Sequence, residues 1–282
     1  MEPYPFARFE RHQVDALGID TAYYTAGNPQ NPTHLLIHGM HASGDTFREL
    51  MHGLQDTCYL IAPDIPGFGH SEKPSRFTIS HLCEWLAAFI DELELGPVHL
   101  SGHSFGGLLT AAYALTYPED VLGLIHIAPA LLANEDYPDW FLKIGDSVNY
   151  LGFVDVSVAY GQRLSIATKQ VKLSFVNKNQ HPEIWERRIQ EYQNARSSAD
   201  VMKAVGRTDI HQHLDNLPRP YWLIWGDQDN VLPIKHAHRL LERYPDITFR
   251  ELKPCGHIPP LEKWPELITI YQQYNEAFIS PS

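Results

Sequence analysis

Short apolar runs of strand length alternate with helical segments along most of this 282-residue chain, and no other feature constrains its fold as much. Buried strands are predicted at residues 33–38, 58–62, 98–101 and 121–128, and helices at 44–54, 78–95 and 105–117. Strands and helices in steady alternation predict right-handed crossovers and a parallel sheet with helices packed against it. We therefore expect an α/β protein with a mostly parallel, doubly wound sheet.

The alternation has an antiparallel start and one long interruption. Residues 8–17 and 19–26 read as a hairpin that turns at Gly18. Residues 130–217 contain helical patches at 140–150 and 181–205 but no convincing strand. The alternation then resumes with a strand at 221–225, a helix near 234–243, a strand at 247–252 and a last helix at 264–278. We expect a core domain of residues 1–129 and 218–282, interrupted by a helical insertion of residues 130–217.

Charge and composition exclude several classes of function. A formal net charge of −12 and a pI near 5.7 argue against a nucleic-acid partner, because phosphate binding needs a basic face. The longest apolar runs, 121–127 and 221–225, are too short to cross a bilayer. No basic leader precedes an apolar stretch, and the three cysteines are odd in number and far apart, which favours a reducing cytoplasm. No cluster of metal-ligand residues is evident, so neither a metal nor an organic cofactor is expected.

The nucleophile candidate is Ser104, within Gly102-His103-Ser104-Phe105-Gly106. This G-x-S-x-G pattern lies where a predicted strand ends and a helix begins. A serine on such a sharp turn projects its hydroxyl above the sheet, and small neighbours let the backbone pass without clashes. The free N–H groups of the helix start can stabilise a developing oxyanion.

The candidate general base is His257, one of sixteen histidines. It follows a predicted strand, and Pro259 and Pro260 just after it are expected to keep its loop from becoming helical. A loop at the carboxyl edge of the sheet is where a base for Ser104 must lie. His103, adjacent to the serine, is expected to point away along the turn and to be structural.

The orienting acid is one of two aspartates, Asp227 and Asp229, in the loop after the strand at 221–225. Asp227 directly follows Gly226 and is placed to hydrogen-bond the backbone of the turn. Asp229 lies further out, four residues before Pro233. Residue chemistry alone leaves both open.

Five motifs in this order resemble those of the α/β-hydrolase superfamily: 38–40 (HGM), 64–71 (DIPGFGHS), the 102–107 elbow, 226–233 and 255–257 (CGH). In proteins of this kind the acid lies three residues after the glycine and four before the proline, which selects Asp229. The resemblance also implies an oxyanion hole made by the backbone N–H groups of Met40 and Phe105. It further implies that the insertion of residues 130–217 is a cap over the active site.

Several related activities fit the motifs less well. Dehalogenases and epoxide hydrolases of this fold use an aspartate where this chain has Ser104. Hormone-sensitive-lipase-like esterases have a longer glycine run than the one ending at Met40. Proline iminopeptidases typically have tryptophan in place of Phe105, and carbon–carbon hydrolases often have tryptophan in place of Ile258.

The predicted reaction is hydrolysis of a small or medium-sized carboxylic ester through an acyl-enzyme on Ser104. The alternatives are a carbon–carbon hydrolase of the meta-cleavage type and a slow-turnover receptor of the same fold. His38, His103, Trp140 and Phe141 are candidate substrate contacts. The expected partner is the ester alone, and the expected state is a monomer or homodimer.

Overall fold

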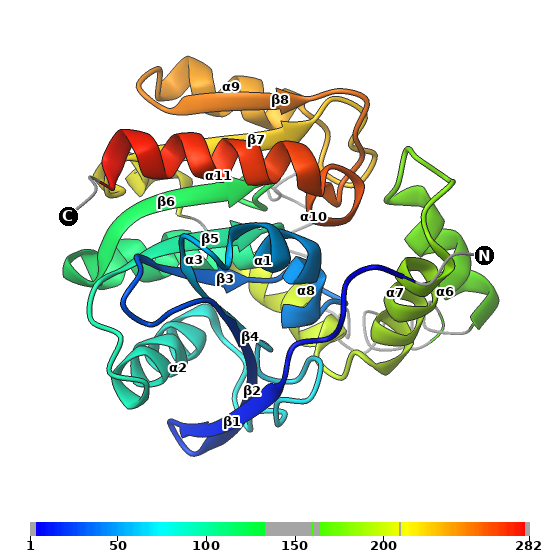
Figure 1. Ribbon diagram of the computed structural model, residues 1–282, viewed down its shortest axis with the longest axis horizontal. Helices are drawn as coiled ribbons and strands as arrows, with labels where there is room; N and C mark the ends of the chain where they lie inside the picture. The colour runs from blue at the N-terminus through cyan, green and yellow to red at the C-terminus, as the bar shows by residue number, and fades with distance from the viewer. Residues whose placement is uncertain (1–3, 133–159, 161–163, 209, 280–282) are drawn as a thin grey trace.

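The computed structural model describes residues 4–132, 160, 164–208 and 210–279, and Figure 1 shows one sheet with helices on both faces. The strands follow the order β1-β2-β4-β3-β5-β6-β7-β8 across the sheet. Their bounds are β1 Arg11–Ala16, β2 Ile19–Ala26, β3 Thr33–Ile37, β4 Tyr59–Pro63, β5 Val98–His103, β6 Val121–Ile127, β7 Tyr221–Gly226 and β8 Thr248–Leu252. The predicted α/β fold is confirmed.

The sheet is antiparallel only at its first edge. β1 pairs with β2 and β2 with β4 in antiparallel fashion, whereas the pairs from β3 and β4 through to β8 are parallel. The hairpin between β1 and β2 turns at Leu17 and Gly18, whose φ angles are +58° and +73°. Positive φ at both central residues gives the turn the twist that strands need, which explains the glycine.

Two hydrophobic clusters cover the two faces of the sheet. Helices α2 (Ile79–Glu92), α3 (Phe105–Thr116) and α9 (Lys235–Arg243) contribute buried side chains to the larger cluster. Helices α1 (Arg48–Leu54) and α11 (Trp264–Phe278) contribute to the other. A parallel sheet covered on both faces has strands that are apolar throughout, which is why short apolar runs identified them in the sequence.

In the described part of the segment between β6 and β7, the regular elements are helices, joined by loops and with no strand. It contains α6 (Leu164–Leu173), α7 (Pro182–Asn194), α8 (Ser198–Arg207) and the 3₁₀ helix η3 (His211–Asn216). In Figure 1, α6 and α7 lie well to one side of the sheet. The helix predicted at 181–205 is two helices, separated at residues 195–197, and α6 was not predicted. The helical patch predicted at 140–150 falls outside the described residues.

Short helices complete the described chain. The 3₁₀ helices η1 (Gly44–Phe47) and η2 (Pro118–Asp120) precede α1 and β6. The loop of His257 is not helical, as expected, and the one-turn helix α10 (Pro259–Glu262) begins only at the first of the two prolines. Both prolines occupy the first positions of α10, where the missing N–H groups have no intrahelical acceptor in any case.

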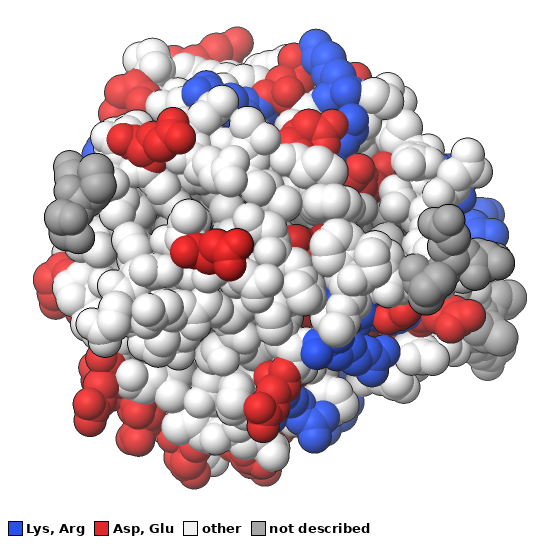
Figure 2. Space-filling model, in the orientation of Figure 1, with Lys and Arg blue, Asp and Glu red and all other residues white. Residues whose placement is uncertain are grey.

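The surface shows no concentration of basic charge on the face in Figure 2, where Lys and Arg lie among Asp and Glu. Within the described ranges, no helix combines the length and the apolar character needed to traverse a membrane.

Candidate active site

Ser104 lies on the sharp turn between β5 and α3. Its backbone has φ +53° and ψ −117°, a region that L-residues seldom occupy. Glycines make this turn possible: a Cβ on Gly106 would lie 2.2 Å from the carbonyl oxygen of Ile37, and one on Gly102 would lie 2.6 Å from the Cα of Gly107. Since the flanking residues have no side chains, β5 and α3 approach closely enough to raise Ser104 above the sheet edge.

His257 lies between Ser104 and Asp229. Its Nε2 is 3.1 Å from Ser104 Oγ, and its Nδ1 is 2.7 Å from Asp229 Oδ2. Both His257 and Asp229 are buried. An ionised carboxylate only accepts hydrogen bonds, so Nδ1 carries the proton and the Nε2 lone pair faces the serine hydroxyl. The three predicted side chains therefore come together from three separate loops.

The second oxygen of Asp229 is also occupied. Oδ1 accepts hydrogen bonds from the backbone N–H groups of Val231 and Leu232, both at 2.8 Å. These two donors fix the carboxylate so that its other oxygen points at His257.

Asp227 contacts the backbone, as the sequence suggested for it. Its Oδ1 accepts a hydrogen bond from the N–H of Cys255 at 3.0 Å, and its own N–H donates to Leu252. Asp227 thus ties the loop after β7 to the loop that carries His257. It does not face the imidazole, and Asp229 is the aspartate that the geometry favours as the orienting acid.

His38 is held by the backbone on both sides of its ring. Nδ1 donates to the carbonyl oxygen of Gly39 at 2.7 Å, and Nε2 accepts from the N–H of Ile65 at 2.9 Å. Complete burial lowers the pKa of His38 to about 3, so the ring is neutral. With both nitrogens engaged, His38 has no hydrogen bond left for a ligand, and the prediction of a substrate contact is not supported for it.

His103 supports the loop of the base. Its Nε2 donates to the backbone carbonyl oxygen of His257 at 2.7 Å, and its buried Nδ1 has no partner among the described residues. Burial, with a smaller contribution from His257, holds its pKa well below the ordinary value. His103 also lines the cavity at Ser104, so the structural role expected for it does not exclude contact with a ligand.

Two backbone N–H groups near Ser104 have no acceptor among the described residues, those of Met40 and Phe105. Phe105 begins α3, where the first N–H groups of a helix have no intrahelical acceptor. Met40 follows Gly39, at which an added Cβ would lie 3.0 Å from Ser104 Cβ, so its loop runs beside the elbow. The two N–H groups predicted for an oxyanion hole thus have no acceptor among the described residues; Phe105 adjoins the serine in the sequence, and Met40 follows Gly39, which lies beside it in space.

A cavity of about 290 Å³ opens at this site. Ser104 and His257 line it together with Met40 from the β3 loop and with Val171, Arg188 and Tyr192 from the helices between β6 and β7. Arg188 was not predicted as a site residue, although Ile184, Arg188 and Tyr192 follow one another at i, i+4 and so share a helix face. Trp140 and Phe141, the other predicted contacts, lie outside the described residues. Where the structure describes the chain, no group of three His, Cys, Asp or Glu side chains could hold a metal ion.

Comparison with known proteins agrees with this geometry. Residues 32–263 match the family model described as the alpha/beta hydrolase fold. The uncharacterized hydrolase YugF of Bacillus subtilis is 27% identical over 92% of this chain and 94% of its own length. The human monoacylglycerol lipase ABHD6 is 24% identical over 86% of this chain and 74% of its own.

Among solved structures, a thermophilic esterase from Thermogutta terrifontis aligns with a TM-score of 0.79 at 22% identity, covering 96% of this chain and 100% of that one. At this identity the similarity establishes the fold. With a family model matched over most of its length, the chain belongs to the α/β hydrolase fold family.

Proposed function

We propose that this protein is a serine hydrolase that cleaves a carboxylic ester, with Ser104 as nucleophile, His257 as general base and Asp229 as the acid that orients it. The observation that carries the proposal is the position of His257, within hydrogen-bond distance of both Ser104 Oγ and Asp229 Oδ2. A serine hydroxyl is a weak nucleophile until such a base removes its proton. Membership of a hydrolase family, and relatives that include a lipase and an esterase, support the ester as the bond cleaved.

In the first half-reaction, Ser104 Oγ attacks the ester carbonyl while its proton passes to His257 Nε2. The resulting imidazolium keeps its Nδ1–H bond to Asp229, and the paired negative charge stabilises it. His257 then donates the proton to the departing alcohol, which leaves an acyl group on Ser104. In the second half-reaction, His257 removes a proton from water, the water attacks the acyl-enzyme, and the acid product is released.

The backbone N–H groups of Met40 and Phe105 are proposed as the oxyanion hole. Each is unpaired among the described residues and can donate to the oxygen that becomes negative in the tetrahedral intermediate. A donor of this kind contributes about 3–4 kcal/mol to transition-state stabilisation. Because the donors are backbone groups, replacing the side chains of Met40 or Phe105 does not remove them.

We also propose that residues 130–217 form a cap domain on the core of residues 1–129 and 218–282. Val171 and Phe175 at the end of α6 and Ile184 of α7 are buried against Ile258 and Leu261, which follow the base. This small apolar cluster fastens α6 and α7 beside the mouth of the site, where their remaining side chains line the cavity.

The test is steady-state and burst kinetics on 4-nitrophenyl esters from acetate to palmitate. Ser104→Ala should reduce kcat/KM by about 10³-fold or more, as in other enzymes that lose a triad serine. Ser80→Ala, on the exposed side of α2, is the matched control and should retain full activity. A burst followed by a stall would indicate a receptor rather than an esterase, and cleavage of vinylogous diketones alone would indicate carbon–carbon hydrolysis. Undiminished turnover by Ser104→Ala would refute the proposal.

A further inference from the structure

Arg188 is a charged side chain in the wall of the active-site cavity. It projects from α7, is only 5% exposed, and lines the same cavity as Ser104 and His257. Among the described residues of that wall, no other side chain is a lysine, arginine, aspartate or glutamate. A buried guanidinium in an otherwise uncharged wall needs a partner, because removing a charge from water is costly unless it is paired.

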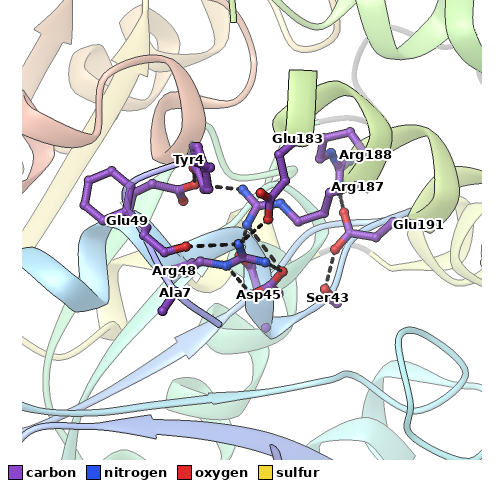
Figure 3. Close-up of polar contacts among 12 residues, drawn as sticks. Tyr4, Ala7, Ser43, Asp45, Arg48, Glu49, Glu183, Arg187, Arg188 and Glu191 are labelled. Carbon is purple, nitrogen blue, oxygen red and sulfur yellow. Dashed lines mark hydrogen bonds and ion pairs between the residues drawn. The ribbon is translucent and has the colours of Figure 1, made fainter. Parts of the chain in front are cut away.

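Only one side of the guanidinium of Arg188 is paired. Nη1 donates to Glu191 Oε2 at 2.5 Å, and the other oxygen of Glu191 accepts from Ser43, as Figure 3 shows. Nε is buried without a partner, and no bond from Nη2 to a described residue exists. No described residue therefore occupies the edge formed by Nε and Nη2, while Glu191 holds the opposite side in place.

The neighbouring arginines show how complete such pairing is elsewhere. Arg187 donates to Glu49 at 2.9 Å and to Asp45 at 3.3 Å, and Arg48 donates to Glu183 at 2.8 Å. These contacts attach α7 to η1 and α1 (Figure 3). Each of these two guanidiniums meets more than one carboxylate. Within the described ranges Arg188 meets one carboxylate, that of Glu191, although it is buried to a similar degree.

The unoccupied edge has the geometry that binds an oxyanion. Nε–H and Nη2–H of a guanidinium are parallel and match the two oxygens of a carboxylate. Two other imidazoles of the described wall are kept neutral, because burial lowers the pKa of His41 to about 3 and that of His103 well below its usual value. The positive charge of Arg188 lowers both pKa values further.

We propose that Arg188 is a specificity-determining residue that binds an anionic group of the substrate, so that the preferred esters carry a carboxylate in addition to the ester bond. This inference rests on the proposed ester hydrolysis at Ser104. The anionic group belongs to either the acyl part or the alcohol part of the ester. The carboxylate pairs with the Nε–Nη2 edge and leaves the Glu191 contact intact.

The test compares each charged ester with its neutral isostere. To place the charge in the acyl group, 4-nitrophenyl monoesters of dicarboxylic acids of four to eight carbons are paired with the corresponding carboxamides. To place it in the alcohol, the butanoyl ester of glycolic acid is paired with that of glycolamide. The wild-type protein should show a kcat/KM about 10- to 100-fold higher for the carboxylate member of at least one pair, mainly through KM, as expected for a charge-assisted bond. Arg188→Met should bring that ratio to about 1.

Controls separate this inference from the proposed function. Arg187→Met, next to Arg188 but outside the cavity wall, should keep the wild-type ratio. If the wild type cleaves neutral esters and its kcat/KM is the same for the carboxylate and the carboxamide of every pair, the anion site is refuted while ester hydrolysis is supported. If no ester is cleaved, the site is tested by thermal unfolding in the presence of glutarate or glutaramide. A Tm of the wild type that glutarate raises and glutaramide does not, with no rise in Arg188→Lys, supports the anion site. No change in the Tm of the wild type overturns it.

Discussion

Replacing Asp229 with asparagine tests the proposed triad at the residue that the sequence left open. In the wild type, Asp229 Oδ1 accepts from the N–H groups of Val231 and Leu232, and Oδ2 accepts from His257. Asparagine has one acceptor oxygen and one NH₂ donor. Because the N–H groups of Val231 and Leu232 need an acceptor, the amide oxygen of the asparagine faces them, and its NH₂ group faces His257 Nδ1.

A donor facing Nδ1 reverses the tautomer of the imidazole. Nδ1 must then accept, the proton moves to Nε2, and the nitrogen facing Ser104 no longer has a lone pair to receive the hydroxyl proton. The same substitution in a serine protease triad lowers kcat by about 10⁴-fold with the geometry intact. For Asp229→Asn we expect a loss of about 10³- to 10⁴-fold in kcat, which corresponds to about 4–5.5 kcal/mol of activation free energy.

Asp227→Asn is the matched control, two residues away with the same change in charge. Its oxygen can still accept from the N–H of Cys255, so we expect kcat to fall less than about 10-fold. The assay is kcat on the best nitrophenyl ester, with circular dichroism to verify that both variants are folded. An Asp227→Asn loss as large as that of Asp229→Asn, or a fully active Asp229→Asn, would refute the tautomer argument.

Two further substitutions test the elbow and the loop below it. Gly106→Ala places a Cβ 2.2 Å from the carbonyl oxygen of Ile37 and should lower the free energy of unfolding by about 1–3 kcal/mol. The Cβ of Gly206→Ala in α8 meets no atom within 4 Å, and this variant should raise the free energy of unfolding by about 0.5–1 kcal/mol. Urea denaturation measures both, and equal effects of the two substitutions would contradict the argument. Burial raises the pKa of Asp64 to about 7, so between pH 5 and 7 the unfolded carboxyl is ionised while the folded one keeps its proton, and wild-type stability falls as pH rises. The stability of Asp64→Asn relative to the wild type should therefore improve by up to about 2.7 kcal/mol from pH 5 to pH 7, and a constant difference would show that Asp64 is already ionised at pH 5.

The core was predictable because its strands are buried on both faces. Apolar runs of five to seven residues then indicate strands. The predicted last helix also agrees with α11 (Trp264–Phe278) at both ends. The start of α2 also depends on local chemistry, since Thr78 Oγ1 accepts from the N–H of His81. These features depend on neighbours in sequence or on burial alone.

The helices between β6 and β7 were harder to predict because their positions depend on distant contacts. α7 is polar over much of its length, and its buried Arg187 is compensated only by Glu49 and Asp45, which lie far earlier in the chain. The break before α8 lies at Ser197, which is completely buried. A sequence pattern reports neither the ion pairs of Arg187 nor the burial of Ser197, so α7 and α8 were predicted as one helix.

Within the site, the serine and histidine follow from motifs, but the choice of acid needed more. Asp227 and Asp229 are both acidic, both in one loop, and differ only in which groups they meet. The resemblance chose Asp229, and the geometry gives the physical reason. Arg188 was missed because a residue lines a cavity by virtue of where its helix lies, which no local pattern reports.

The one-turn helix α10, which begins directly after the loop of His257, explains how that loop and the insertion are joined. It presents Glu262, whose Oε1 accepts from the N–H of Gly256 and whose Oε2 accepts from Val176 and Asn177. His257 itself donates its N–H to the carbonyl oxygen of Ser174. His257, the proposed base, is therefore anchored to the segment after α6 from both sides, through its own backbone and through Glu262. A displacement of that segment must also displace the imidazole, so the insertion sets the geometry of the base as well as the shape of the cavity.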